Sequence, residues 1–171
     1  AGESYVIRGA GVNEEFFVPA PEPALDTPLL VFPSRMLYDK GLGTLIEAAR
    51  ILKGRTAARI ALVGDLDPGN PTTADEASLH CWESEGLVEW WGFQKDMRAV
   101  YQNCTLVTLP SLGEGLPTVL IEAASCGRPI VTTDVPGCRE VVADGVNGLL
   151  VPPNHPDALA GAIEALIHAP D

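Results

Sequence analysis

Two glutamates stand eight residues apart in the stretch EGLPTVLIEAASCG, which runs from Glu114 to Gly127. The residues between them are mostly apolar, with Pro117 near the start. Proline in the first turn and glycine just past the last are typical of a helix, which we predict over residues 117–127. Glu114 then lies in the loop before the helix, and Glu122 lies roughly 8 Å along the axis from Pro117. A carboxylate accepts hydrogen bonds from a vicinal diol, so two at this spacing suit a ligand that carries sugars at both ends.

The start of the predicted helix also offers backbone hydrogen-bond donors. A helix N-terminus combines unpaired amides with the positive end of the helix dipole, and together they bind anions. Gly113 and Gly115 let such a ligand approach the backbone closely. A simpler interpretation of the two acids stays open, in which Glu122 lies on the wet edge of the helix and Glu114 is a favourable N-terminal charge. The free amides are those of Gly115, Leu116, Thr118 and Val119, because Pro117 has none.

Two cations, Arg35 and Lys40, lie five residues apart in PSRMLYDKG, between a predicted strand and the helix that follows it. The chain as a whole is acidic, since 11 Lys and Arg against 23 Asp and Glu give a net charge of −12. This balance disfavours nucleic acid and anionic membrane surfaces as partners. An anion site on such a protein must be locally positive, so we predict that Arg35, Lys40 and the helix N-terminus form one pocket for a phosphate or diphosphate. The alternative is that both cations are solvated surface charges.

The elements that must position these residues alternate along the chain. Short apolar runs are each followed by a stretch of helical periodicity, which predicts an α/β fold with a Rossmann-like, doubly wound parallel sheet of about six strands. Ligands bind such sheets at the carboxyl ends of the strands, here in the loops at 33–41, 64–72, 92–96, 110–117 and 134–138. The strands are predicted at residues 29–33, 59–64, 88–92, 105–110, 129–134 and 148–152, and the helices at 41–53, 78–86, 96–104, 117–127, 138–143 and 156–169.

The length of 171 residues, 46% of them apolar, suffices for one domain with one core. Residues 1–27 are rich in Gly, Pro and acids and show no sustained period, so we predict a linker there and the folded domain over 28–171. No apolar run reaches 18 residues and the start of the chain does not resemble a signal peptide, so we expect a cytoplasmic location. The four cysteines form no C-x-x-C pair and are interpreted as reduced thiols.

Other chemistries have little support in the sequence. Asp65 and Asp67 form a D-x-D pattern that some enzymes use to hold a metal, but three letters in an acidic loop are a weak indication. His80, His155 and His168 have no partners at catalytic or zinc-binding spacing. The absence of G-x-G-x-x-G and of G-x-x-x-x-G-K-[ST] disfavours a dehydrogenase or a P-loop NTPase.

Several stretches together resemble one enzyme family. They are SRMLYDKG, ALVGD, EWWGF and LPSLGEGLPTVLIEAASCGRPIVTTDVPGCREVVADGVNGLLVPP. These look like the carboxy-terminal half of a retaining glycosyltransferase of family 4, in which E-x7-E is a specific signature. The resemblance covers residues 5–171 and implies one half of a GT-B fold, in which two Rossmann-like domains face each other across a cleft. The stretch GVNEEFFVP at 11–19 resembles the segment that crosses between the two domains.

The resemblance also implies a role for each candidate residue. The family transfers a sugar, with retention, from a nucleotide-diphosphate sugar such as a UDP- or GDP-sugar to a glycan or lipid-linked acceptor, which suggests polysaccharide or lipopolysaccharide biosynthesis. Glu114 would be catalytic, near the anomeric centre, and Glu122 would hold the ribose. No cofactor and no bound metal are implied. The donor diphosphate would be bound by Arg35, Lys40, Gly115, Leu116, Thr118 and Val119, and the nucleobase would lie beside Gly92, Phe93 and Gln94.

One half of the family's architecture is not in this chain. The amino-terminal domain supplies the acceptor site and part of the catalytic centre, and the last helix, which crosses back to it, is cut short here. We therefore expect a donor-binding module that transfers no sugar alone, with the full-length enzyme peripheral at the inner face of the cytoplasmic membrane. Two alternatives stay open: a non-catalytic nucleotide-sugar-binding module and a sugar-nucleotide epimerase of the same fold.

Overall fold

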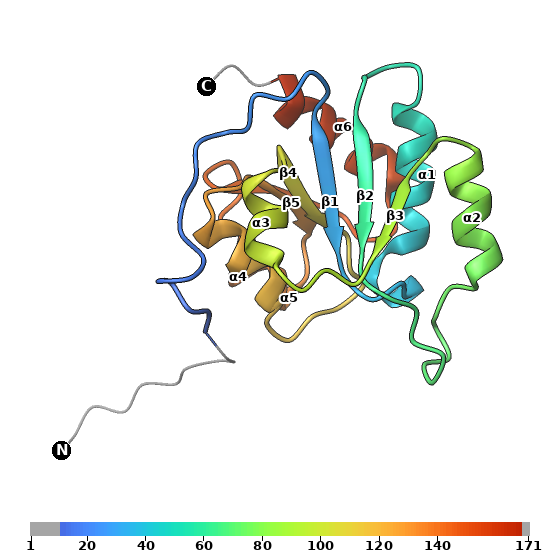
Figure 1. The fold of residues 1–171 in the computed structure, drawn as a ribbon, viewed down its shortest axis with the longest axis horizontal. Helices are drawn as coiled ribbons and strands as arrows, with labels where there is room; N and C mark the ends of the chain where they lie inside the picture. The colour runs from blue at the N-terminus through green and yellow to red at the C-terminus, as the bar shows by residue number, and fades with distance from the viewer. Residues whose placement is uncertain (1–10, 169–171) are drawn as a thin grey trace.

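The computed structural model of the chain describes residues 11–168 and contains a six-stranded sheet surrounded by helices (Figure 1). The strand order is β3-β2-β1-β4-β5-β6 and all neighbouring strands pair in parallel. This order confirms the predicted Rossmann-like, doubly wound sheet, because the chain winds to one edge, returns to the centre and winds to the other edge. The strands are β1 (Leu29–Pro33), β2 (Arg59–Val63), β3 (Glu89–Gly92), β4 (Leu106–Leu109), β5 (Ile130–Thr133) and β6 (Gly148–Val151).

The helices cover both sides of the sheet. α1 packs against α6 and α3 packs against α4, and Figure 1 shows α3, α4 and α5 together on one side of the molecule with α1 and α2 on the other. Strands β1, β4 and β5 are buried along their whole length, which explains their continuous apolar runs. The helices are α1 (Leu42–Leu52), α2 (Glu76–Ser84), α3 (Met97–Gln102), α4 (Thr118–Ser125), α5 (Pro136–Arg139) and α6 (Pro156–His168), with a short 3-10 helix, η1 (Tyr38–Lys40).

The fifth helix differs from the prediction, which placed it at residues 138–143. It begins at Pro136, whose fixed φ and missing amide suit the first helical position. It ends early because the side chain of Asn147 competes for the backbone that a longer helix would use. The Asn147 amide oxygen accepts a hydrogen bond from the Ala143 amide at 2.8 Å, and its nitrogen donates to the Val141 carbonyl at 3.0 Å. The prediction was wrong because the hydrogen-bonding capacity of this asparagine is not visible in periodicity.

The predicted linker, residues 1–27, can be followed from residue 11, and residues 1–10 and 169–171 lie outside the described part of the chain. Residues 11–27 form no helix or strand, but they do not hang free of the domain. The buried guanidinium of Arg128 donates hydrogen bonds to the carbonyls of Ala20 and Pro21, and also to those of Cys104 and Cys126. One arginine therefore fixes the last part of the linker to the domain.

Candidate functional site

The carboxyl ends of β1 and β4 bring the two predicted loops together. Gly41 makes this approach possible: it has a positive φ of 81°, and a Cβ at this position would lie 1.9 Å from the carbonyl oxygen of Pro110, in the loop after β4. The Leu112 amide also donates to the Asp39 carbonyl at 2.9 Å. A side chain at Gly41 would separate the loops, so this glycine is required for the close contact between Lys40 and Glu114 described next.

Lys40 and Glu114 form an ion pair between the two loops. Lys40 Nζ lies 2.7 Å from Glu114 Oε1, and the Ser111 hydroxyl donates to the same oxygen at 2.6 Å. The Glu114 side chain is 9% exposed and that of Lys40 is 27% exposed. Both residues line a cavity of about 260 Å³ together with Arg35 and the first residues of α4. Arg35, Lys40 and the helix N-terminus thus line one pocket, and the binding of a phosphate or diphosphate in it stays a prediction.

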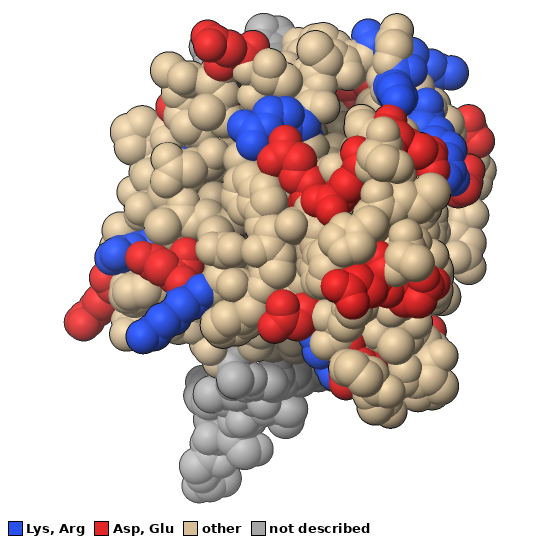
Figure 2. Space-filling model, turned by 45° about the vertical axis from the view of Figure 1, so that its right-hand side comes forward, with Lys and Arg blue, Asp and Glu red and all other residues tan. Residues whose placement is uncertain are grey.

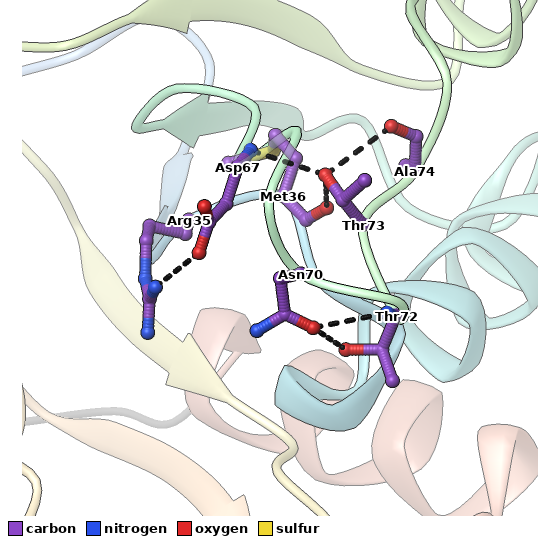
Figure 3. A network of polar contacts seen from close by, with 7 residues as sticks. All are labelled: Arg35, Met36, Asp67, Asn70, Thr72, Thr73 and Ala74. Carbon is purple, nitrogen blue, oxygen red and sulfur yellow. Dashed lines mark hydrogen bonds and ion pairs between the residues drawn. The ribbon is translucent and has the colours of Figure 1, made fainter.

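Arg35 is held by a carboxylate that the sequence did not single out for this role. Its guanidinium forms an ion pair with Asp67, in the loop after β2 (Figure 3). That loop is fastened to the loop after β1, because the Asp67 amide donates to the Thr73 hydroxyl at 3.1 Å and the Ala74 amide donates to the Met36 carbonyl at 2.8 Å. Asp67 therefore lies at a fixed position beside Arg35.

The D-x-D pattern thus contains two separate contacts. Asp65 Oδ1 accepts a hydrogen bond from the Phe93 amide at 3.0 Å, whereas Asp67 faces Arg35. Within residues 11–168, no group of three or more His, Cys, Asp and Glu side chains is arranged to hold a metal ion.

The first turn of α4 presents its amides without capping side chains. Pro117 is the N-cap residue and makes no side-chain cap hydrogen bond. A Cβ at Gly115 would meet nothing within 4 Å, so open space lies beside this backbone. The loop before α4 is in close contact with α5, because a Cβ at Gly137 would lie 2.4 Å from the Glu114 carbonyl oxygen. Helix α5 therefore supports this loop. No described residue accepts a hydrogen bond from the predicted donors, the amides of Gly115, Leu116, Thr118 and Val119.

A second cavity of about 420 Å³ adjoins the first and shares Arg35 and Val119 with it. Phe93 and Gln94 line it, and the Phe93 side chain is exposed at 71%. Gly92 ends β3 with a positive φ of 64°, which turns the chain toward this cavity. The predicted loop at 92–94 therefore lies beside the cavity that Arg35 and Lys40 line, and its exposed aromatic ring offers an apolar surface for a flat ligand.

Glu122 lies one turn beyond Val119 on α4 and lines neither cavity. The Tyr101 hydroxyl donates a hydrogen bond to Glu122 Oε2 at 3.0 Å. Burial raises the pKa of Glu122, and the Tyr101 hydrogen bond partly opposes that rise. The Glu122 carboxylate is thus half-buried at the edge of α4 and engaged by a side chain from α3, and its role as a ribose ligand stays a prediction.

The chemistry of this edge of the sheet suits a phosphorylated ligand. Two cations and unpaired helix amides meet in one small cavity, and an apolar cavity adjoins it. Sequence reasoning missed Ser111, Asp67 and Tyr101. Ser111 lies three residues before Glu114 in the same loop, so its proximity offered a signal, whereas nothing in the sequence pairs Asp67 with Arg35 or Tyr101 with Glu122.

The comparisons with known proteins agree with this geometry. The family model described as "Glycosyl transferases group 1" matches residues 27–169. This chain belongs to the group 1 glycosyltransferases. The match covers both cavities and every predicted site residue.

Relatives of this glycosyltransferase domain have stated activities. The N,N'-diacetylbacillosaminyl-diphospho-undecaprenol alpha-1,3-N-acetylgalactosaminyltransferase of Campylobacter jejuni is 33% identical over 140 residues, which are 82% of this chain and 35% of that protein. The amylovoran biosynthesis glycosyltransferase AmsK of Erwinia amylovora is 32% identical over 173 residues, 94% of this chain and 41% of that protein. The chain thus spans less than half the length of these relatives.

Solved structures show the same fold. HepE from Anabaena, in complex with UDP and glucose, superposes with a TM-score of 0.77 and 26% identity over 92% of this chain and 46% of that one. The chain therefore corresponds in fold to about one half of a protein whose structure contains UDP and glucose. No helix among the described residues is long and apolar enough to cross a membrane.

Proposed function

We propose that this chain is the donor-binding domain of a retaining family 4 glycosyltransferase, which transfers a sugar from a nucleotide-diphosphate sugar to a glycan or lipid-linked acceptor. One observation carries the proposal: Arg35, Lys40 and the uncapped N-terminus of α4 line a single cavity. A diphosphate needs cations and amide donors, and this acidic chain gathers both at one place. The relatives that act on lipid-linked or polysaccharide substrates support the acceptor class, and with it a position at the inner face of the cytoplasmic membrane.

In this proposal each group has one task. Arg35, Lys40 and the amides from Gly115 to Val119 bind the diphosphate, Glu114 contacts the donor sugar, and Glu122 accepts hydrogen bonds from the ribose. The loop from Gly92 to Gln94 lies beside the nucleobase. When the bond from the sugar to the diphosphate breaks, negative charge grows on the leaving oxygen, and preorganised cations and amides stabilise it. These groups belong to the chain itself, so we propose that the step uses no cofactor and no metal.

A thermal-shift screen of the chain with UDP, GDP and ADP tests the donor site. A ligand at 100 times its dissociation constant stabilises the folded protein by about 2.7 kcal/mol, or roughly 5–11 °C in melting temperature for a chain of this size. We expect a shift with at least one nucleotide and the loss of most of it in Glu122→Ala. The absence of any shift, in this chain and in the full-length protein, would overturn the proposal.

Turnover by the full-length protein tests the reaction. Glu114→Ala should abolish sugar transfer while UDP binding falls much less, because the proposed contact of Glu114 is with the sugar. The anomeric configuration of the product, read by NMR, should match that of the donor. An inverted product, or full turnover by Glu114→Ala, would contradict the assigned mechanism.

A further inference from the structure

The contact between Tyr101 and Glu122 joins two helices, α3 and α4. α3 packs against α4, and the Tyr101 hydroxyl donates to Glu122 Oε2 at 3.0 Å. Tyr101 is completely buried and is the largest such side chain among the described residues. A buried hydroxyl of this kind needs a partner, and here the partner is the carboxylate that the proposed function assigns to the ribose.

The position of the Tyr101 ring is fixed on several sides. The ring of Phe17, from the linker segment, lies with its centroid 6.2 Å from that of Tyr101 at an interplanar angle of 53°. The Tyr101 carbonyl accepts hydrogen bonds from the amide and the thiol of Cys104, each at 3.3 Å. The hydroxyl therefore has little freedom to follow Glu122, and it is Glu122 that must take the position that Tyr101 sets.

The charges around the pair give the hydrogen bond a direction. Burial first, and then the facing Glu122 carboxylate, keep the pKa of Tyr101 far above its ordinary value, so the phenol stays protonated and acts as the donor. Burial raises the pKa of Glu122, and the Tyr101 bond lowers it. The other titratable group that interacts with Glu122 is the thiol of Cys126, the C-cap residue of α4, whose pKa is raised mainly by burial and lowered by Arg128 and Arg98. Within residues 11–168 no cation shifts the pKa of Glu122, so Tyr101 is the group that stabilises its anion.

We propose that Tyr101 is a positioning residue that fixes the Glu122 carboxylate for the two ribose hydroxyls of the nucleotide. This inference rests on the proposed function, because it requires Glu122 to bind the ribose. The bond to Oε2 leaves Oε1 and the remaining lone pairs of the carboxylate for the ligand. Two hydroxyls presented together are then met by one carboxylate that is already oriented.

The Tyr101→Phe variant of this chain tests the inference, because it removes one oxygen and keeps the ring. The probes are UDP and 2′,3′-dideoxy-UDP, with the guanosine and adenosine pairs measured alongside by calorimetry. We expect Tyr101→Phe to weaken binding of the ribonucleotide about five- to tenfold and to leave the dideoxynucleotide unchanged. In a Glu122→Gln background, Tyr101→Phe should have no further effect. Tyr38→Phe, which removes the same atom from an exposed side chain, is the matched control.

The pH dependence of nucleotide binding gives a second measurement, which a loss of packing alone would not change. A ribonucleotide loses its acceptor as the pH falls through the pKa of Glu122, and without the Tyr101 hydrogen bond that pKa is higher. Binding by Tyr101→Phe should therefore weaken at a higher pH than binding by the wild type. Equal losses for both nucleotides, or an unmoved profile, would overturn the inference.

The same data separate this inference from the proposed function. If Glu122→Ala binds the two nucleotides with the wild-type ratio, the ribose assignment itself is wrong. If Glu122→Ala removes the difference between them while Tyr101→Phe keeps it, only the role of Tyr101 is wrong.

Discussion

At the scale of single residues, the site consists of cations already engaged by acids. Lys40 contacts Glu114, and Arg35 contacts Asp67. Each cation must therefore share its charge between a carboxylate of the protein and the proposed diphosphate. The two pairs differ in exposure, because Glu114 is nearly buried whereas the Arg35 side chain is 58% exposed. Removing the cation Lys40 from one pair and the carboxylate Asp67 from the other should have opposite effects on ligand binding, because the first removes a proposed ligand group and the second a competitor for one.

Lys40→Met should weaken both the fold and the site. It leaves the nearly buried Glu114 carboxylate with only Ser111 as a donor, which costs about 1–3 kcal/mol of unfolding free energy. Affinity for inorganic pyrophosphate should fall by roughly 10- to 100-fold, since a charged hydrogen bond is lost. Urea denaturation and calorimetry measure the two effects. Lys53→Met changes an exposed lysine that does not line the cavity and donates to the Glu85 carbonyl, so it should leave the affinity for pyrophosphate unchanged.

Asp67→Asn should instead strengthen pyrophosphate binding. The change removes a competing negative charge from Arg35 while the backbone contact of residue 67 with Thr73 remains. An exposed ion pair contributes about 0.2–1 kcal/mol, so the gain should be roughly two- to fivefold. Glu89→Gln serves as the control. It removes the same charge from the ion pair with Arg59, which lies at the amino ends of β2 and β3, away from the site. Weaker binding by Asp67→Asn would show that Asp67 orients Arg35 rather than competing for it.

Glu122→Gln should stabilise the fold at high pH. The pKa of Glu122 is raised in the folded state, so the folded protein holds this proton more tightly than the unfolded chain. The proton on Glu122 therefore stabilises the folded state at pH values below the pKa of Glu122 in the unfolded chain. This stabilisation is lost as the pH rises through the pKa of Glu122 in the folded protein. The variant should melt higher than the wild type at pH 8, by about 2–4 °C for each kcal/mol gained, and the difference should disappear near pH 4. An equal rise in melting temperature at pH 8 and at pH 4 would show that the ionisation of Glu122 is not its cause.

The residues of the site could be predicted in part because their positions follow from the parallel sheet. Arg35, Lys40 and the amides of α4 were found from their places in loops after strands. Their ion pairs with Glu114 and Asp67 were not predicted, because Lys40 and Glu114 are 74 residues apart and Arg35 and Asp67 are 32 apart in sequence. Pairing at such separation depends on loop conformation, which apolar periodicity does not encode.

At the scale of elements, helix α5 acts on the site without contributing a ligand group. Its Gly137 lies against the carbonyls of Glu114 and Gly115, which form the loop before α4. The strands were predicted almost to the residue, because buried parallel strands are continuous apolar runs. The helix that supports the loop was misplaced by two residues at its start, since its limits depend on Pro136 and on the side chain of Asn147.

A pair of glycine variants tests this support. Gly137→Ala places a Cβ 2.4 Å from the Glu114 carbonyl oxygen, so the loop must move, and we expect a loss of about 1–3 kcal/mol in stability together with weaker pyrophosphate binding. Gly115→Ala places its Cβ in open space, so stability should stay within about 0.5 kcal/mol while the methyl group obstructs the anion. Thermal melting and calorimetry distinguish the two outcomes. Equal stability of both variants would contradict the supporting role of α5.

At the scale of the whole molecule, an acidic chain carries a site whose two cations, Arg35 and Lys40, are paired with acids. On the face drawn in Figure 2, Lys and Arg side chains lie next to Asp and Glu side chains. With a net charge of −12, the protein repels anions at long range, so the diphosphate must be attracted by contacts within a few ångströms. The domain is thus built to hold a ligand that enters the cavity rather than to draw one in from a distance.

The last prediction concerns what such a domain does alone. The relatives are more than twice as long as the segments that match this chain, and both cavities lie at an open edge of the sheet. In the proposed function the other half of the enzyme holds the acceptor and shields the sugar from water, and exclusion of water and positioning of the second substrate are large parts of transferase catalysis. We therefore expect the 171-residue chain to bind nucleotide weakly and to transfer no sugar from a labelled donor, whereas the full-length protein under the same conditions transfers it. Turnover by the purified chain above that of its Glu114→Ala variant would contradict this expectation and would place the entire reaction within this one domain.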